Sequence, residues 1–435
     1  MKKHFYISLL MAALTFSSQA QELVPITKTE VLSKVSENNN SIKISEQEFN
    51  VARAEYRQTN AVFLPNITAS HTAMATTNPL MAFGSKLNQE ILTSSDFNPA
   101  QLNNPSQIEN YTTKFEIVQP LINLDGIYHR KAAKSKMEAM SLKTTRTQEY
   151  LVFEVEKAYM QLQLAYKAVD VLAKARDAAN ANLKLANNSF KQGYLQRADV
   201  LTVEVRVTEV QNQLYNAKSN VQNASNYLSF LMNDDAYVMY TPIDSLAVTK
   251  LTVENKIISE NRSDIKAMQL ASNAYESMNK ADKLAFLPRL NAFGSYELYD
   301  DKVFQGDANG YLFGAQLTWD IFQGAKRFGK VEKSKAQFEK SKLEYQHYVS
   351  QSNLDLNKAK RAFLDAENKL KLTTLALEQS EESLRIRTNR FKEGLEKTSD
   401  LLLAETQFAQ KQLEYYQTIF EYNYTQAYLQ FLTKE

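Results

Sequence analysis

Two short stretches with the same spacing interrupt two long helical patterns, and they constrain the fold more than any other feature. One stretch runs from Phe190 to Leu201, and the other runs from Phe391 to Leu402, 201 residues later. They match without a gap at Phe, Lys, Gly, Asp and the closing Leu. A glycine that ends one helix and an aspartate that starts the next are typical of a helix-turn-helix tip. The match therefore predicts two helical hairpins in a duplicated chain.

The long helices that precede these tips repeat as well. Before the first tip, a stripe of period seven contains Val155, Leu162, Val169, Arg176, Leu183 and Phe190. Before the second tip, the equivalent stripe contains Phe363, Leu370, Leu377, Leu384 and Phe391. A sustained heptad pattern indicates left-handed supercoiling against neighbouring helices. A helix of about 64 residues is roughly 95 Å long, so we expect an extended side-by-side array and no single compact core.

The first 20 residues have the pattern of a secretory signal peptide. Lys2 and Lys3 precede an apolar run from about Ile7 to Phe16, and a small residue, Ala20, follows at the expected cleavage site. The run is about half the length of a membrane-spanning helix, which needs roughly 20 apolar residues. The chain contains no cysteine, which excludes disulfides and thiolate metal sites. We predict no metal and no cofactor, and a nearly neutral mature chain that favours no nucleic-acid partner.

Each repeat also contains a predicted β-hairpin between its helices, at about 66–119 and 289–321. The pairs Leu64-Pro65 and Leu287-Pro288 stop the preceding helices, and the polar stretch at about 78–107 is predicted to be a long loop. The strands alternate between an aromatic face and a more polar face. The lipid-facing candidates are Tyr111, Phe115, Tyr296, Tyr311, Phe313 and Trp319. The alternative is that these aromatic side chains form the core of a soluble sandwich.

The first repeat is expected at 21–232 and the second at 252–435, with a linker at 233–251. The two short helices of a repeat, stacked end to end, would be as long as its continuous helix. Four strands cannot close a barrel, and lipid forbids open sheet edges, so three chains with 12 strands are expected. The predicted fold is mainly α with a small β part. It is a trimeric α-helical barrel continuous with a 12-stranded transmembrane β-barrel, to which each chain gives four strands.

At this level of detail the chain resembles the TolC family of outer-membrane efflux proteins. The resemblance rests on the two Leu-Pro pairs, on Gln119–Ile122 with Asp125 and Gly126, on Trp319–Gly324 and on the two tips. It implies a homotrimeric, passive channel-tunnel in the outer membrane of a Gram-negative-type cell, with a helical tunnel in the periplasm. The implied partners are a periplasmic membrane-fusion adaptor and, through it, an inner-membrane RND, ABC or MFS transporter. Such a protein takes part in tripartite efflux or type I secretion and is not an enzyme.

The resemblance also implies a gate at the periplasmic end, near the tips. Asp400 lies where the family can place a ring of aspartates, and Asp199 is the equivalent residue of the first tip. Leu403 stands where a second aspartate ring can occur, and Glu396 stands where a gate-locking arginine can occur. The resemblance therefore implies an apolar constriction at Leu403 in place of that salt bridge. The alternative role for an aspartate at a helix start is that of an N-cap.

The turns themselves are candidates for contact with the adaptor. The residues concerned are Gly193, Tyr194 and Leu195 in the first tip and Gly394 and Leu395 in the second. The alternative is that their apolar side chains only pack locally within the turn.

Two other functions are considered for this sequence. The stretch Gly324–Lys330 has the spacing of a phosphate-binding loop, but Val331 stands where a Ser or Thr would hold Mg²⁺. The other alternative is a periplasmic coiled-coil adaptor or scaffold without channel activity. An adaptor has one helical hairpin within β-rich domains, whereas this sequence predicts two hairpins and few strands.

Overall fold

The structure, a computed structural model, describes residues 23–234, 238–249 and 257–434. The expected signal peptide at 1–20 and parts of the expected linker at 233–251 lie outside these residues. The contacts divide the chain into two compact units. Unit 1 contains the described residues of 1–46, 143–265 and 348–435, and unit 2 contains those of 47–142 and 266–347.

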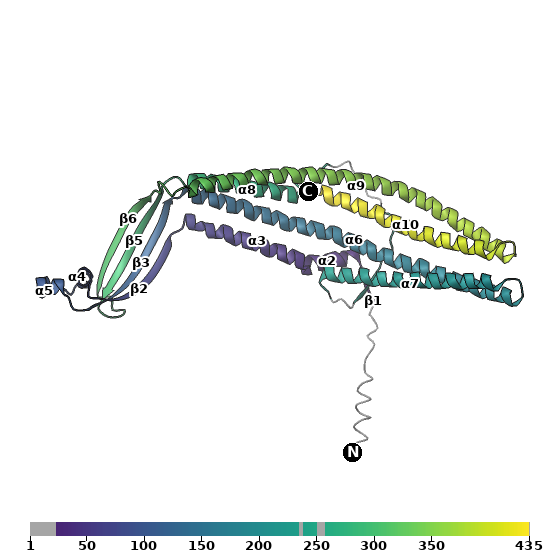
Figure 1. Ribbon diagram of the computed structural model, residues 1–435, viewed down its shortest axis with the longest axis horizontal. Coiled ribbons are helices and arrows are strands. Elements are labelled where there is room, and N and C mark those ends of the chain that lie inside the picture. Colours follow the sequence, from purple (N-terminus) through teal and green to yellow (C-terminus); the bar gives the residue numbers. More distant parts are fainter. Residues whose placement is uncertain (1–22, 235–237, 250–256, 435) are drawn as a thin grey trace, which may run out of the picture. The chain divides into compact units, whose positions relative to one another are not determined.

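The order of the elements follows the predicted repeat of helix, strand, strand, long helix and helix (Figure 1). In the first repeat these are α3 (Asn40–Gln58), β2 (Asn66–Thr76), β3 (Ile108–Ile122), α6 (Leu124–Lys191) and α7 (Arg197–Met232), with α2 (Lys28–Asn38) before them and the 3-10 helix η1 (Thr59–Val62) after α3. In the second they are α8 (Ser263–Leu284), β5 (Arg289–Asp300), β6 (Ala308–Thr318), α9 (Lys326–Lys392) and α10 (Thr398–Thr433). The prediction of a mainly α fold with a small β part is confirmed.

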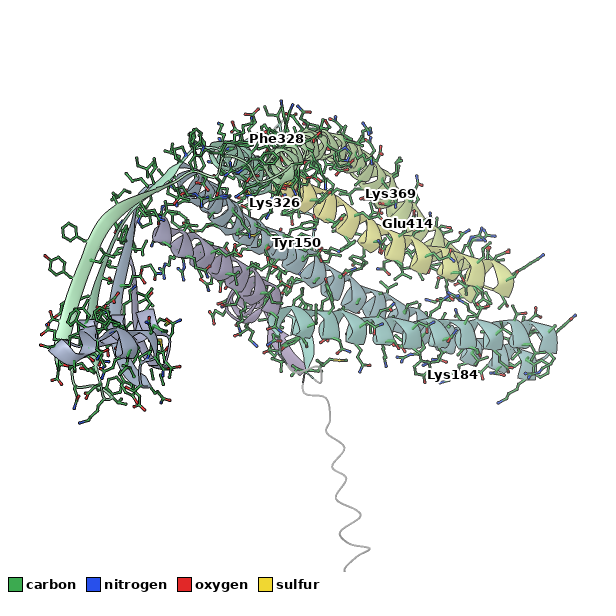
Figure 2. All side chains as sticks on the ribbon, turned by 60° about the vertical axis from the view of Figure 1, so that its left-hand side comes forward. Tyr150, Lys184, Lys326, Phe328, Lys369 and Glu414 are labelled. Atoms are coloured by element: carbon green, nitrogen blue, oxygen red, sulfur yellow. The ribbon has the colours of Figure 1, made fainter. Side chains whose placement is uncertain are left out.

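The two long helices have 68 and 67 residues, and their heptad stripes are buried to different degrees. In α6, Val155 and Leu162 are fully buried in the main apolar cluster of unit 1, together with Leu228 of α7. In α9 the stripe that includes Leu370 and Leu377 is only half-buried. Charged side chains, among them those of Lys184, Lys369 and Glu414, cover much of the remaining helical surface (Figure 2). The second repeat therefore leaves more of its stripe uncovered than the first.

The predicted loop at about 78–107 contains helices, so that prediction was wrong in part. The structure places α4 (Pro79–Asn88), the 3-10 helix η2 (Ser94–Phe97) and α5 (Pro99–Asn103) in this stretch. The Asn78 side chain accepts a hydrogen bond from the Met81 amide, and Asn98 accepts one from the Ala100 amide. Proline suits the position after such a cap, because its missing N–H would have no partner there. The Asn-Pro pairs that the sequence presents as turn signals are thus helix starts.

A two-stranded parallel sheet in unit 1 was not predicted. Strand β1 (Leu23–Ile26) pairs with β4 (Met239–Pro242), which lies within the expected linker. The hydroxyl of Tyr159 donates to the Ile26 carbonyl, and that of Tyr166 donates to the Tyr240 carbonyl, both at 3.1 Å. The small sheet is thereby held against α6. Its strands are too short and too distant in sequence to give a periodic signal.

Two strand ends differ from the prediction. Strand β3 continues to Ile122, with an irregular register between Pro120 and Ile122. Strand β6 ends at Thr318, so Trp319 does not belong to it. The Trp319 indole N–H instead donates to the Phe286 carbonyl at 2.9 Å. This hydrogen bond turns the residue toward the end of α8 and takes it out of the alternating pattern.

The larger sheet, in unit 2, is antiparallel with the strand order β2-β3-β5-β6. The two hairpins meet at the β3–β5 pair, and β2 and β6 form the edges. On one face, Phe115 lies opposite Tyr296, which lies opposite Tyr311. On the other face, Lys114 lies 3.4 Å from Glu297 and 3.7 Å from Glu116. The two faces of this sheet thus suit different surroundings, one apolar and one aqueous.

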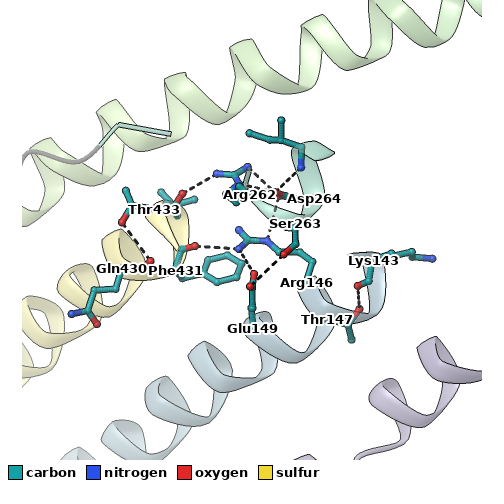
Figure 3. A network of polar contacts seen from close by, with 12 residues as sticks. Lys143, Arg146, Thr147, Glu149, Arg262, Ser263, Asp264, Gln430, Phe431 and Thr433 are labelled. Carbon is teal, nitrogen blue, oxygen red and sulfur yellow. Dashed lines mark hydrogen bonds and ion pairs between the residues drawn. The ribbon is translucent and has the colours of Figure 1, made fainter. Parts of the chain in front are cut away.

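The short helices of each repeat meet end to end within unit 1, as the sequence predicted. At the end of α7, the Asn39 side-chain amide donates to the Leu231 carbonyl at 2.7 Å. At the end of α10, the Arg262 guanidinium donates to the Leu432 carbonyl at 3.0 Å (Figure 3). The last carbonyls of a helix have no partner within it. A side chain from just before the next helix supplies that partner at both joints.

The joint between α10 and α8 contains a buried network of charges (Figure 3). Arg262 is only 2% exposed and donates to both carboxylate oxygens of Asp264, at 2.7 and 3.0 Å. Burial raises the pKa of Asp264, but the hydrogen bonds from Arg262 and Tyr348 outweigh this effect and lower it overall. Arg146 of α6 adds an ion pair with Asp264 at 3.3 Å and lies over the Phe431 ring. The network joins four helices, α6, α8, α9 and α10, at one point.

We expect Arg262→Ala to destabilise the protein by about 3 to 5 kcal/mol, because it leaves a buried carboxylate with fewer partners. Thermal unfolding followed by circular dichroism measures this change. Arg385→Ala removes an exposed ion pair with Glu382 and should lower the unfolding temperature far less, because water screens that pair. Equal losses in the two variants would show that the joint does not stabilise the fold.

Candidate functional site

The two tips have the same backbone geometry in unit 1. Gly193 has φ +81 and Gly394 has φ +76, a left-handed conformation that favours glycine. The amide of Gly193 donates to Phe190, and the amide after it donates to Ser189. Gly394 repeats this pattern with Phe391, and Leu395 repeats it with Arg390. Both long helices thus end in the same double hydrogen-bond motif, as the glycines predicted.

The aspartates of the tips are not N-caps, so that alternative is corrected. The N-cap positions are Gln196 and Lys397, and Asp199 and Asp400 lie three residues farther, in the first helical turn. Asp199 accepts a hydrogen bond from the Gln196 amide at 3.0 Å. Asp400 accepts a longer one, at 3.4 Å, from the Ser399 hydroxyl. Acidic side chains suit this position because of the positive end of the helix dipole, and Asp400 is the less firmly held.

The first tip is closed by apolar packing. Leu195 is half-buried against a cluster of Ala186, Val200, Val203 and Leu402. Leu402 comes from α10, so the two hairpins touch near their tips. Tyr194, the other candidate for adaptor contact, is 80% exposed. Local packing near the turn therefore buries part of the Leu195 side chain but leaves the Tyr194 side chain exposed.

The second tip is closed by ion pairs that the sequence interpretation missed. Glu396 lies 2.6 Å from Arg387 and 2.8 Å from Arg390, both on α9. The hydrogen bond from Arg390 is the largest cause of a pKa of Glu396 below its usual range. Arg390 also donates to the Leu395 carbonyl at 3.2 Å. In the sequence, Arg387 and Arg390 lie one helical turn apart shortly before Gly394, and this spacing could have predicted the ion pairs with Glu396.

The equivalent positions explain the difference between the tips. Glu396 corresponds to Leu195, and Arg387 corresponds to Ala186. An apolar contact in the first repeat is thus an ion pair in the second. Leu395, at the turn, is 66% exposed.

Three consecutive leucines lie near the start of α10, and they differ in exposure. Leu401 and Leu402 are buried, whereas Leu403 is 54% exposed. One turn along α10, Glu405 accepts a hydrogen bond from Asn182 of α6, and burial raises the pKa of its carboxyl. Within the first two turns of α10, Leu403 is thus exposed and Asp400 is half-buried.

The sheet of unit 2 presents most of the predicted aromatic candidates on one face. Phe115, Tyr296, Tyr311 and Phe313 are exposed there, and Tyr111 is half-buried. Trp319 is exposed but lies beyond the strand. In the described part of the chain, no helix combines the length and apolarity needed to cross a membrane.

The possible phosphate-binding stretch does not form a ligand cradle. Residues from Lys326 onward belong to α9, and Lys330 lies 2.8 Å from the Asp282 carboxylate of α8. The lysine is therefore engaged in an ion pair between helices. Among residues 23–234, 238–249 and 257–434, no group of three or more His, Asp or Glu side chains could hold a metal ion.

A family model described as "Outer membrane efflux protein" matches residues 31–234 and 256–433. The fold is similar to that of the Campylobacter jejuni CmeC outer membrane channel, with 16% identity and a TM-score of 0.81 over 93% of this chain and 85% of that chain. It is similar to the outer membrane protein VceC of Vibrio cholerae, with 16% identity and a TM-score of 0.80 over 93% and 95%. It is also similar to the Neisseria gonorrhoeae MtrE outer membrane channel in its open state, with 17% identity and a TM-score of 0.77 over 93% and 88%. No curated protein matches the chain.

We expect acid to loosen the second tip but not the first. In the folded protein the pKa of the Glu396 carboxyl lies below its usual value of 4.5. The ion pairs of Glu396 are therefore fully formed above pH 4.5 and are lost as the pH falls through this lowered pKa. The protection factors of the tip amides, which correct for the slower intrinsic exchange in acid, should therefore fall more at 391–397 than at 190–196. Glu396→Gln should give fast exchange at neutral pH, whereas Glu393→Gln, an exposed neighbour, should not. Equal acid responses of the two tips would contradict the ion-pair closure.

Proposed function

This chain belongs to the outer membrane efflux protein family, and on this basis we propose that it is a passive channel-tunnel. It conducts substrates from the periplasm, or from an inner-membrane pump, to the exterior. The sheet lies in the outer membrane and the helices form a tunnel in the periplasm, after export with a cleaved signal peptide. The observation that carries the proposal is the four-stranded sheet with one aromatic face, one charged face and two unpaired edges.

The sheet supports an assembly of three chains. An unpaired edge leaves a row of backbone N–H and C=O groups without partners, which is not tolerated in lipid. If β2 of one chain pairs with β6 of the next, three chains close a ring of 12 strands. The aromatic face then contacts lipid, and the face with Lys114, Glu116 and Glu297 lines the channel.

The helices support the same assembly through the internal repeat. In α10, Leu402 packs near the first tip, and the ring of Phe431 stacks on Phe153 of α6 with centroids 5.4 Å apart. The equivalent residues of α7 are Leu201 and Phe230, and both are exposed, Phe230 by 73%. A second copy of the chain could cover Leu201 and Phe230, as α6 covers the equivalent residues of α10 within one chain.

The partner of this exposed stripe is α9 of the next chain. The residue of α9 equivalent to Phe153 is Leu354, and it is exposed. Pairing α7 of one chain with α9 of the next would repeat, between chains, the contact that α10 and α6 make within one chain. Three chains related in this way close a ring of helices.

The tips are the periplasmic mouth in this proposal. Tyr194 and Leu395, with Gly193 and Gly394 beside them, present exposed apolar side chains to a periplasmic membrane-fusion adaptor. The adaptor connects the channel to an inner-membrane RND, ABC or MFS transporter. Asp400 and Leu403 form the gate, and Asp199 occupies the matching position in the first tip. A ring of three Asp400 carboxylates would favour cations, and Glu396 holds the second turn in place.

The alternative is a periplasmic coiled-coil adaptor or scaffold. It leaves the two-faced sheet without a role, because a soluble adaptor has no use for an exposed row of aromatic side chains.

The assembly is tested with Phe230→Cys combined with Leu354→Cys. Because the chain has no other cysteine, we expect oxidation to give covalent trimers in detergent-extracted outer membrane. Phe230→Cys combined with Ile386→Cys is the matched control, since Ile386 lies about 48 Å farther along α9. Recovery of the protein as a soluble periplasmic monomer would overturn the proposed channel.

The gate is tested by conductance in planar bilayers. Asp400→Asn should lower the preference for cations, and Leu403→Ser should increase the open fraction by weakening the apolar constriction. Asp199→Asn is the matched control in the first tip, and we expect a smaller effect. If neither Asp400→Asn nor Leu403→Ser changes the cation preference or the open fraction, the gate lies elsewhere.

A further inference from the structure

Helix α4 lies at the turn end of the sheet in unit 2 and is attached to its charged face. The Gln89 side chain donates to the Glu109 carbonyl at 2.9 Å, to the Asn110 side chain at 2.8 Å and to the Asp300 carbonyl at 3.1 Å. Asn110 alternates with Thr112 and Lys114, so its side chain belongs to the charged face. Both Gln89 and Asn110 are buried. These three hydrogen bonds from the buried Gln89 side chain thus hold α4 over the charged face.

The opposite side of α4 is apolar and uncovered. Ala82, Ser85 and Gln89 form its buried side. Leu80, which is 81% exposed, and Leu87 lie on the other side, and the exposed Ile91 follows just beyond the helix end. Leu80, Gly84 and Leu87 have the spacing of a single helix stripe, and Ile91 follows Glu90, whose φ of +61 ends the helix. The stripe contains no charge, so water is an unfavourable neighbour.

Lipid is not the occupant of this stripe. The aromatic face, which suits lipid, is on the opposite side of the sheet, where the Phe304 ring packs on His71 with centroids 4.2 Å apart. His71 lies directly opposite Thr113, on the face of Phe115. Helix α4 is therefore on the channel side. The occupant must reach the stripe from within the ring.

The occupant that fits is the same helix of the other copies. Twelve strands about 4.8 Å apart, tilted by about 40°, form a ring about 24 Å wide between opposite strand backbones, and α4 lies at the turn end of this ring. Three helices about 10 Å in diameter form a triangle about 22 Å wide. Each α4 follows an edge strand, β2, so a ring of three chains brings three copies to the same level.

We propose that the three α4 helices pack through Leu80, Leu87 and Ile91 and form an apolar plug across the outer end of the channel. This inference rests on the proposed three-chain channel. It gives the channel a barrier at its exterior end, separate from the tips. A charged or polar solute could pass only after the helices separate.

The contact is tested by oxidising purified oligomers that carry Leu87→Cys. Three such cysteines meet at one point, so we expect one disulfide-linked pair and one free chain per trimer. Ser106→Cys, an exposed position in the same connection but outside α4, should remain unlinked. A Leu87→Cys protein that stays unlinked, while the Phe230→Cys and Leu354→Cys pair still gives covalent trimers, would overturn the plug and leave the channel proposal intact.

Conductance gives a second, independent measure of the plug. Leu80→Lys combined with Leu87→Lys places like charges in the contact and should raise single-channel conductance in planar bilayers. Ser106→Lys adds a charge nearby and should leave the conductance unchanged. Capture of a different protein by the stripe, with unchanged conductance in the lysine variant, would also overturn the plug. Loss of all channels and all covalent trimers would instead refute the proposed function.

Discussion

The heptad stripe of α6, from Val155 to Phe190, needs neighbouring helices to cover it, and this constraint governs the chain. No second continuous helix of the same repeat does so. The cover is made from shorter helices that meet end to end, α7 with α3 and α10 with α8. Each joint leaves terminal carbonyls inside a rod of packed helices. The side chains of Asn39 and Arg262 satisfy those carbonyls, and without them the rods would be interrupted in the middle.

Local and periodic signals made much of this fold predictable. The glycines at 193 and 394 and the prolines at 65 and 288 mark real ends, because their backbone limits act within a few residues. Features that depend on distant partners were missed. Strand β1 becomes a strand only beside β4, and Glu396 meets Arg387 only after the turn reverses the chain. At the tips, the location was therefore predictable and the closing chemistry was not.

The two repeats use one geometry with different side chains. In the first tip, Leu195 packs near Ala186, and in the second, Glu396 pairs with Arg387. Apolar packing is insensitive to pH and salt, whereas exposed ion pairs respond to both. A duplicated chain can in this way combine a permanent element and an adjustable one at equivalent places. A single repeat used six times around a ring could not separate these properties.

The small parallel sheet in unit 1 has a consequence for the order of folding. Leu23 pairs with Met239, so nearly the whole first repeat lies between two strands that must find each other. A growing chain makes β1 first and holds it without a partner until β4 emerges. Such long-range pairing is slow and leaves an apolar segment open to wrong contacts. The first repeat is therefore fully folded only after one late step, in which β1 pairs with β4 and the sheet packs on Tyr159 and Tyr166.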